Sequence, residues 1–205
     1  MDLPTSPHNT ELFGQFDGDF PEENRCINIE FPASLVRKHR FWPNSSLSAK
    51  FIADYISVFL PPQGSREKQI RHRAEVADAV RYITNELLEN AFKFSCTEAN
   101  QPVLLIPYCW HNRLVITVTN TSHISTIDGF KEIIHDLTTI DPMELYVRRS
   151  EENLSTEHSL TSGLGLITIL TNYDAQLGWK LEHQLPDVDC FTVTTMVQLL
   201  YELAM

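Results

Sequence analysis

Residues 81–95 read RYITNELLENAFKFS, and the pattern of this stretch decides the fold. On a helix that advances about 100° per residue, Glu86, Asn90 and Lys93 form one short row because they are spaced by four and three positions. The apolar positions of the same helix lie beside that row and predict a buried face: Val76, Val80, Ile83, Leu87, Ala91 and Phe94. A carboxylate, an amide and an ammonium group are therefore expected along the edge of the core.

Length and composition limit the class of protein. A chain of 205 residues fits one domain that buries roughly 70% of its unfolded surface. The net charge of −11 argues against a nucleic-acid partner, because neutralising phosphates needs clustered Lys and Arg. Four cysteines without a CxxC pair favour reduced thiols over a zinc site or disulfides. With no signal sequence and no apolar run of membrane length, we expect a soluble cytoplasmic protein without a membrane partner.

The order of predicted elements indicates an α/β fold. Residues 1–24 are rich in Pro, Asp, Glu and Asn and predict a loosely held arm, followed by one domain over 25–205. The domain is expected to contain, in order, a short strand (26–31), two helices (44–60 and 67–94), a β-hairpin (103–110 and 114–120), a long polar connection with two short helical patterns (130–137 and 142–149), a glycine turn entering a helix (162–173) and two strands (177–185 and 190–203). This order predicts helices on one face of a mixed sheet.

The first predicted helix carries an aromatic row. Phe51, Tyr55 and Phe59 are each four positions apart, so they share one side of the helix. We expect this row to be part of the core rather than a groove for a partner.

Two segments of the chain carry a resemblance to a known family. NELLENAFKF (85–94) resembles the N-box helix of the GHKL superfamily, which includes gyrase, heat-shock chaperone, histidine kinase and mismatch-repair ATPases. SGLGLITI (162–169) resembles the glycine motif that closes the nucleotide pocket of that family. The motifs are in the family's order, and the resemblance covers roughly residues 45–200. It implies a two-layer α/β sandwich of the GHKL type, with ATP and Mg²⁺ as cofactors.

The resemblance also implies roles for individual residues. Glu86 would orient or activate the attacking nucleophile, Asn90 would coordinate the magnesium ion, and Lys93 would reach a phosphate or the lid. Magnesium prefers hard oxygen ligands and keeps several waters, so one amide oxygen is sufficient from the protein. The glycine motif would place backbone N–H groups and the positive end of a helix against the phosphates. Its residues are Ser162, Gly163, Leu164 and Gly165.

The chain departs from the family at the motif that reads adenine. The family has D-x-G-x-G after the second strand of the hairpin, and the matching positions here are Asn120, Ser122 and Ile124. Asn120 still offers a carbonyl oxygen to the adenine amino group. Isoleucine is sterically costly where the backbone approaches a ligand closely or has a positive φ.

Each of these signals also has a purely structural interpretation. The polar row of residues 86–93 is compatible with a solvated helix face. Gly163 and Gly165 are compatible with a tightly packed helix entry, and Asn120 with an ordinary turn at the end of a strand.

The details within the superfamily favour one type of function. Histidine kinases have Asn where this chain has Glu86, whereas a Glu there resembles gyrase and the anti-sigma-factor serine kinases. The resemblance thus implies an ATP-dependent serine/threonine protein kinase whose partner is a small partner-switching antagonist or a sigma-factor-like regulatory protein, with a homodimer left open. The alternatives are a degenerate GHKL-fold module that binds proteins without catalysis, which the missing glycines favour, and a detached histidine-kinase ATPase domain.

Overall fold

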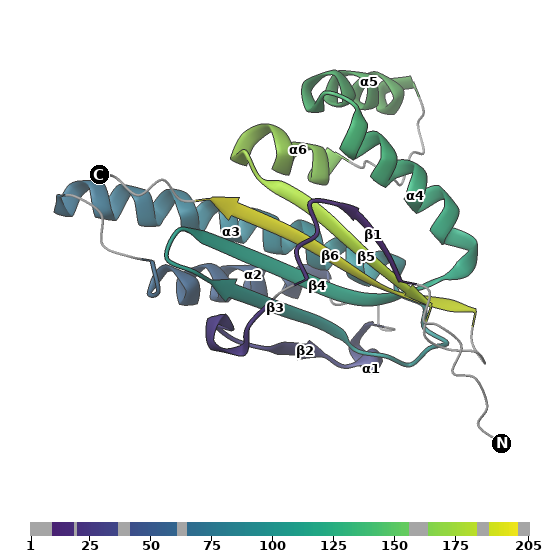
Figure 1. The fold of residues 1–205 in the computed structure, drawn as a ribbon, viewed down its shortest axis with the longest axis horizontal. Helices are drawn as coiled ribbons and strands as arrows, with labels where there is room; N and C mark the ends of the chain where they lie inside the picture. The colour runs from purple at the N-terminus through teal and green to yellow at the C-terminus, as the bar shows by residue number, and fades with distance from the viewer. Residues whose placement is uncertain are drawn as a thin grey trace.

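A six-stranded sheet forms one layer of the molecule (Figure 1). The computed structural model describes residues 10–18, 20–36, 42–60, 65–155, 164–183 and 189–200. The strands are β1 (Thr10–Gly14), β2 (Ile29–Phe31), β3 (Val103–Cys109), β4 (Arg113–His123), β5 (Gln176–His183) and β6 (Cys190–Leu200). Their order is β1-β5-β6-β4-β3-β2, and every neighbouring pair is antiparallel. The predicted two-layer α/β architecture is confirmed, but the sheet is antiparallel rather than mixed.

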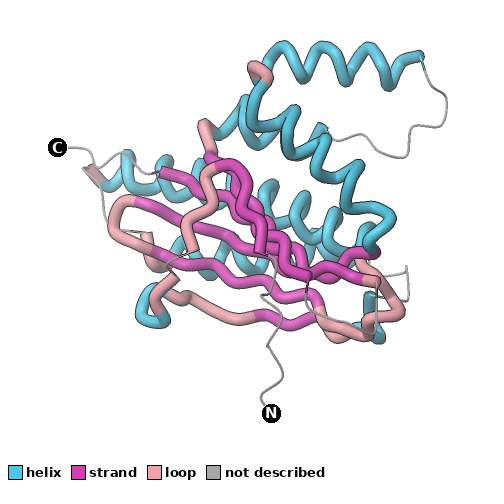
Figure 2. The backbone as a smooth tube through the Cα atoms, turned by 45° about the vertical axis from the view of Figure 1, so that its right-hand side comes forward, coloured by secondary structure: helices cyan, strands magenta, loops and turns pink. Residues whose placement is uncertain are grey.

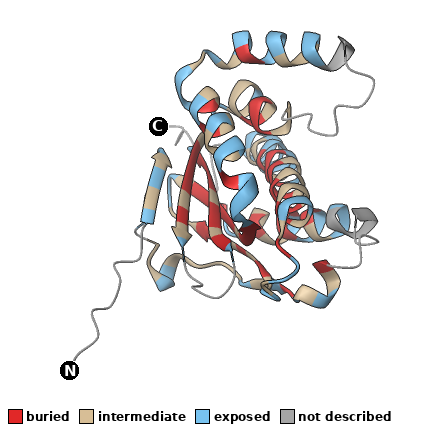
Figure 3. Ribbon diagram, turned by 90° about the vertical axis from the view of Figure 1, so that its right-hand side faces the viewer, coloured by how far each residue is buried: buried red, intermediate tan, exposed pale blue. Residues whose placement is uncertain are grey.

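The helices lie together on one face of this sheet (Figures 2 and 3). They are the 3₁₀ turn η1 (Glu22–Asn24) and the helices α1 (Ala33–Val36), α2 (Trp42–Ser57), α3 (Arg66–Phe94), α4 (Ile124–Thr139), α5 (Pro142–Ser155) and α6 (Leu164–Tyr173). No helix in the described part of the chain is both long enough and apolar enough to cross a membrane.

Helix α3 has sequence signals at both ends. The side chain of Ser65 caps its start by accepting a hydrogen bond from the backbone N–H of Lys68. Glu67 lies in the first turn and Lys93 in the last. The helix dipole favours a negative charge at the start of the helix and a positive charge at its end, so both residues are favourably placed. The predicted apolar face is confirmed for Val76, Val80, Ile83, Leu87 and Ala91, which are buried in the core. The prediction is wrong for Phe94 at the end of the helix, which is 40% exposed.

Residues 10–18 differ from the prediction of a loosely held arm over 1–24, and residues 1–9 lie outside the described part of the chain. Thr10–Gly14 is an edge strand that pairs with β5. Glu11 forms an ion pair of 2.7 Å with Lys131 of α4, and Phe13 packs against the core. Phe16 packs against the small cluster on the opposite face of the sheet. The strand β1 could not be predicted from its polar composition, because its pairing partner, β5, lies far away in the sequence.

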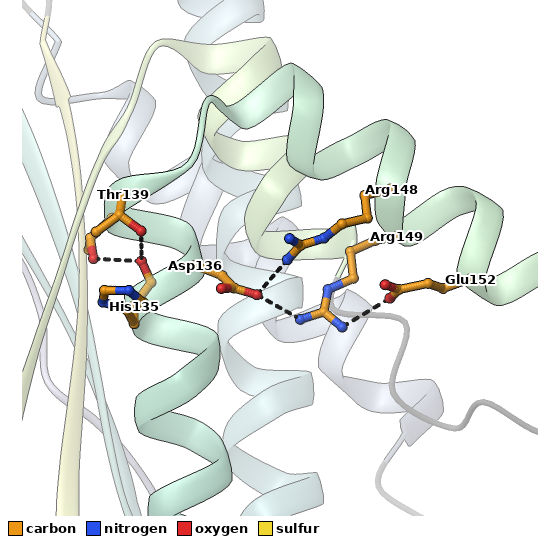
Figure 4. A network of polar contacts seen from close by, with 7 residues as sticks. His135, Asp136, Thr139, Arg148, Arg149 and Glu152 are labelled. Atoms are coloured by element: carbon orange, nitrogen blue, oxygen red, sulfur yellow. Dashed lines mark hydrogen bonds and ion pairs between the residues drawn. The ribbon is translucent and has the colours of Figure 1, made fainter.

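The long polar connection after β4 is mostly helical. The two short helical patterns predicted there extend into α4 and α5, which are joined by a polar network (Figure 4). Asp136 of α4 accepts hydrogen bonds from Arg148 at 2.7 Å and from Arg149 at 3.1 Å, and Arg149 also pairs with Glu152. Two guanidinium groups on one carboxylate therefore tie α5 to α4.

The aromatic row of Phe51 and Tyr55 in α2 and Phe59 in the turn after it is not part of the core, and this prediction is wrong. Phe51 and Phe59 are each 50% exposed, and Tyr55 is partly buried. Fully buried Ile52 and Ile56 form the face of α2 that meets the rest of the molecule. Both faces of α2 are apolar, so the periodicity alone does not show which of them is inside.

The four cysteines are paired, so the prediction of free thiols is also wrong. Cys26 is bonded to Cys109 and Cys96 to Cys190, with Cα–Cα distances of 6.3 and 6.8 Å. The partners are far apart in the sequence, and their proximity follows from the sheet.

Candidate functional site

A cavity of about 260 Å³ lies between the sheet and the helices α3, α4 and α6. Its walls include five residues predicted from the sequence: Glu86, Asn90, Lys93, Asn120 and Gly165. Three separate elements, α3, β4 and α6, bring these residues together. The prediction that the two motifs form one site is therefore compatible with the geometry, and the ligand roles of these residues stay predictions.

Of the remaining residues of the predicted glycine motif, the structure describes Leu164, and this residue does not line the cavity. Leu164 begins α6, is partly buried and packs against the core. Ser162 and Gly163 lie outside the residues that the structure describes.

The polar row of α3 forms one edge of the cavity. Glu86 and Asn90 are partly buried, whereas Lys93 is exposed and its Nζ lies 5.2 Å from the ring centre of Phe94. Glu89, which the sequence analysis did not single out, lines the same edge. It lies three positions after Glu86, and this helical spacing is the signal that would have found it.

The two carboxyl groups of this edge are both harder to ionise than usual. Burial raises the pKa of Glu86, and the neighbouring carboxylate of Glu89 raises it further. Burial also raises the pKa of Glu89, with the ammonium group of Lys93 acting in the opposite direction. A carboxylate with a raised pKa is a better proton acceptor near neutral pH, so Glu86 has a property that a general base needs.

Gly165 and Glu86 are in close contact at the first turn of α6. A Cβ atom at position 165 would collide with the carboxylate of Glu86, so a larger residue there would force the Glu86 side chain to rotate. The positive end of the helix dipole favours a negative group at this place. The presence of glycine at position 165 is therefore explained by the structure, because only a residue without a side chain lets the carboxylate of Glu86 reach the start of α6.

Another wall of the cavity is formed by the end of β4. Asn120 is buried, and its amide nitrogen donates hydrogen bonds of 3.2 Å to the backbone oxygen of Thr121 and to Ser122 Oγ. Ser122 Oγ in turn donates to the backbone oxygen of Phe94 at 3.0 Å. Because a backbone oxygen only accepts, the nitrogen of Asn120 must face Thr121. Its amide oxygen is thus the atom that a ligand could use as an acceptor.

The region expected to match D-x-G-x-G has a different backbone. β4 continues to His123, and α4 begins directly at Ile124, whose N–H donates to the backbone oxygen of Asp189 at 2.8 Å. Among the described residues, the non-glycine residues with positive φ are Asn100 and Asp174. The expected steric cost of Ile124 is therefore absent, because the loop that needs glycine is replaced by a junction between strand and helix.

Helix α4 supplies a wall that the sequence did not predict. Thr126, Gly129, Phe130 and Ile133 face the cavity from α4. The sequence analysis predicted a short helical pattern at 130–137 within a long polar connection, and it did not assign this pattern to the site.

The chemistry of the walls fits a magnesium nucleotide in part. An amide, an ammonium group and two carboxylates line the cavity from α3, and an amide oxygen with apolar side chains lines it from β4, β6 and α4. No group of three or more His, Cys, Asp and Glu side chains in the described ranges is arranged to hold a metal ion. The volume is just below the usual range of about 300–1,000 Å³ for ligand pockets, so it accommodates part of a nucleotide as it stands.

Comparison with known proteins supports the fold. No protein-family model matches the chain, and no curated protein matches it. One similar solved structure is a chain of the SiaB-SiaC complex from Pseudomonas aeruginosa, with a TM-score of 0.54 and 12% sequence identity. The match covers 86% of this chain and 91% of that chain. At this identity the likeness shows a shared α/β fold.

Proposed function

We propose that this chain is an ATP-binding regulatory protein of the GHKL type, and that it is a serine/threonine kinase for a small partner-switching antagonist. One observation carries the proposal. Five residues predicted from two separated motifs and a strand end line one cavity. If the polar row of α3 were only a solvated helix face and Gly165 only part of a helix entry, we would not expect both to line one cavity together with the buried Asn120.

Each residue has a task in this proposal. The Asn90 amide oxygen would hold Mg²⁺, Lys93 would neutralise phosphate charge, and Asn120 would accept a hydrogen bond from adenine. ATP bound with Mg²⁺ supplies the phosphoryl group for transfer. Phosphoryl transfer depends mainly on positioning and charge neutralisation, which these side chains provide. Glu86, whose pKa is raised by burial, would take the proton from the serine or threonine hydroxyl of the partner.

The proposal of a protein partner has separate support. The similar structure is that of a complex between SiaB and SiaC, so a chain with this fold is known bound to another protein. For the present chain we infer a small regulatory protein as partner. The cytoplasmic location stays a prediction, and the free thiols on which it partly depended are paired in the structure.

A thermal-shift titration with ATP and ADP, with and without Mg²⁺, tests nucleotide binding. A ligand at a hundredfold excess over its Kd stabilises the fold by about 2.7 kcal/mol. For a chain of this size that corresponds to a rise in melting temperature of about 5–10 °C. An unchanged melting temperature at millimolar ATP and Mg²⁺ would contradict the proposal.

A second candidate function is a protein-binding module without catalysis. The direct junction of β4 and α4 favours it, because the adenine-reading loop is absent there. Single-turnover transfer from labelled ATP to a purified partner separates the two functions. A partner that binds tightly and is never phosphorylated would support the module.

A further inference from the structure

Helix α4 contains a glycine in its interior, although glycine is the least favourable helix residue apart from proline. Other glycines of the chain are explained by a close neighbour. Gly165 leaves room for Glu86, and Gly178 leaves room for the backbone of Phe16. A Cβ atom at Gly129 would meet no atom within 4 Å. Within the described part of the chain, no contact therefore explains why this position of α4 has no side chain.

The open space in front of Gly129 belongs to the candidate cavity. Thr126, Gly129, Phe130 and Ile133 are spaced by three, one and three residues, so they share one side of α4. All four line the cavity, and we call them the α4 face. Because Gly129 has no side chain, a ligand in the cavity can come into direct contact with the helix backbone beside Phe130 and Ile133.

The surroundings of the α4 face suit a flat apolar ring. Val118 of β4 and Val193 of β6 line the same cavity and are only 2% and 3% exposed. Phe130 packs against the apolar cluster that contains Val193, so the helix wall and the sheet wall are continuous. Ligand pockets with apolar and aromatic walls of this kind bind rings by their faces.

The polar atoms beside the α4 face are hydrogen-bond acceptors. Thr126 Oγ1 donates its hydrogen to the backbone oxygen of His123 at 2.7 Å, so its lone pairs remain for a ligand. The amide oxygen of Asn120 is also available, because the amide nitrogen faces Thr121. A ring with an exocyclic amino group supplies the matching donors, and the adenine of ATP is such a ring.

We propose that the base of the bound nucleotide lies on the α4 face, against the helix backbone at Gly129. In this chain the α4 face thus takes the place of the missing D-x-G-x-G loop, since α4 begins directly after β4. Stacking tolerates different bases because every base has a π-face, which fits a site with few contacts to the edge of the ring. The inference rests on the proposed function, because it concerns the base of the nucleotide.

Gly129→Ala tests the proposal, because it adds one methyl group in the open space. In the free protein it should raise the melting temperature by about 2–4 °C, since alanine favours the helix and meets no atom there. In calorimetric titrations it should weaken ATP binding at least tenfold, since the methyl group occupies the place of the base. Damage to the fold does not produce a higher melting temperature together with weaker binding.

Asp128→Ala is the matched control for this variant. Asp128 is the exposed neighbour of Gly129 in α4 and does not line the cavity. At physiological ionic strength, where an exposed charge is largely screened, this variant should bind ATP as the wild type does.

Adenosine separates the base from the phosphates. In ¹⁵N-labelled wild type, adenosine should shift the amide resonance of Gly129, and ligand-observed NMR should detect no adenosine binding to Gly129→Leu. ATP binding that both Gly129→Ala and Gly129→Leu leave unchanged would overturn this inference and leave the proposed function standing. A wild type that binds neither ATP nor adenosine would overturn both.

Discussion

Two parts of the candidate cavity, which we call the α3 end and the β4 end after the elements that form them, differ in how far they follow the GHKL pattern. At the α3 end, Glu86, Asn90 and Lys93 have the residue types and the spacing of the resemblance, and they form one edge. At the β4 end, the expected glycine loop is absent, and Asn120 is held by hydrogen bonds within the strand end.

This difference separates two requirements of a nucleotide site. Binding of phosphate, at the α3 end, needs particular side chains, and α3 presents Glu86, Asn90 and Lys93 on one side because they are spaced by four and three residues. Recognition of adenine, at the β4 end, needs a particular backbone conformation, and here the chain continues from β4 directly into α4. A site of this kind is expected to keep the chemistry of phosphate and to recognise the base weakly.

The largest effect is expected at Glu86. Glu86→Gln should lower phosphoryl transfer by about 10² or more, the usual scale for losing a general base, with ATP affinity changed only a few fold. Single-turnover transfer from labelled ATP measures it. Glu75→Gln is the control, because Glu75 is an exposed residue of the same helix. Undiminished transfer by Glu86→Gln would place the base elsewhere.

Asn90 tests the metal at the same end. Asn90→Ala should remove the dependence of nucleotide binding on Mg²⁺, a loss of about tenfold or more in affinity, because the amide oxygen is the proposed ligand. Calorimetric titration with and without Mg²⁺ measures it. Asn172→Ala changes an exposed asparagine of α6 and should behave as wild type. If Mg²⁺ still strengthens binding to Asn90→Ala, the assignment of the metal ligand is wrong.

Asn120 tests the adenine end. A neutral hydrogen bond contributes about 0.5–1.5 kcal/mol and a charge-assisted one about 1.5–3 kcal/mol, so Asn120→Asp should tighten ATP and ADP binding. The gain is reduced because the second carboxylate oxygen replaces the nitrogen that donates to the backbone oxygen of Thr121. GTP should gain less, because its ring has a carbonyl oxygen at the corresponding place. Asn172→Asp, with the same charge change at the surface, should bind all three as wild type does. Equal or weaker adenine-nucleotide binding by folded Asn120→Asp would show that this end does not read the base.

The smallest effect concerns the stability of the α3 end. The pKa of Glu86 is raised in the native state, so its ionised form is less favourable there than in the unfolded chain. At pH 7, where the unfolded chain has this group ionised, Glu86→Gln should raise the melting temperature slightly. The difference should disappear as the pH falls below the unfolded pKa of the group. A lower melting temperature for Glu86→Gln at pH 7 would mean that the carboxylate stabilises the start of α6.

Local periodicity was enough to predict the helix of the site and the hairpin beside it. Glu67 to Phe94 was expected, and α3 covers Arg66–Phe94, because the apolar repeat from Val76 to Ala91 leaves little freedom. The candidate site was predicted from the same helix together with the resemblance. The sequence did not reveal β1, the cysteine pairs or the wall from α4, because each depends on contacts between distant parts of the chain. The aromatic row of Phe51, Tyr55 and Phe59 was assigned to the core, because its four-residue spacing equals that of Ile52 and Ile56 on the buried face.

The position of β4 has a consequence for the synthesis of the chain. β4 pairs with β3 on one side and along its whole length with β6, the last described strand, on the other. At about 5–20 residues per second, β4 waits several seconds on the ribosome as an unpaired edge before β6 is made. Helix α3 depends on local contacts and can form during this time. The floor of the cavity is thus completed last, and chains released before β6 should aggregate through β4 instead of folding into a smaller working unit.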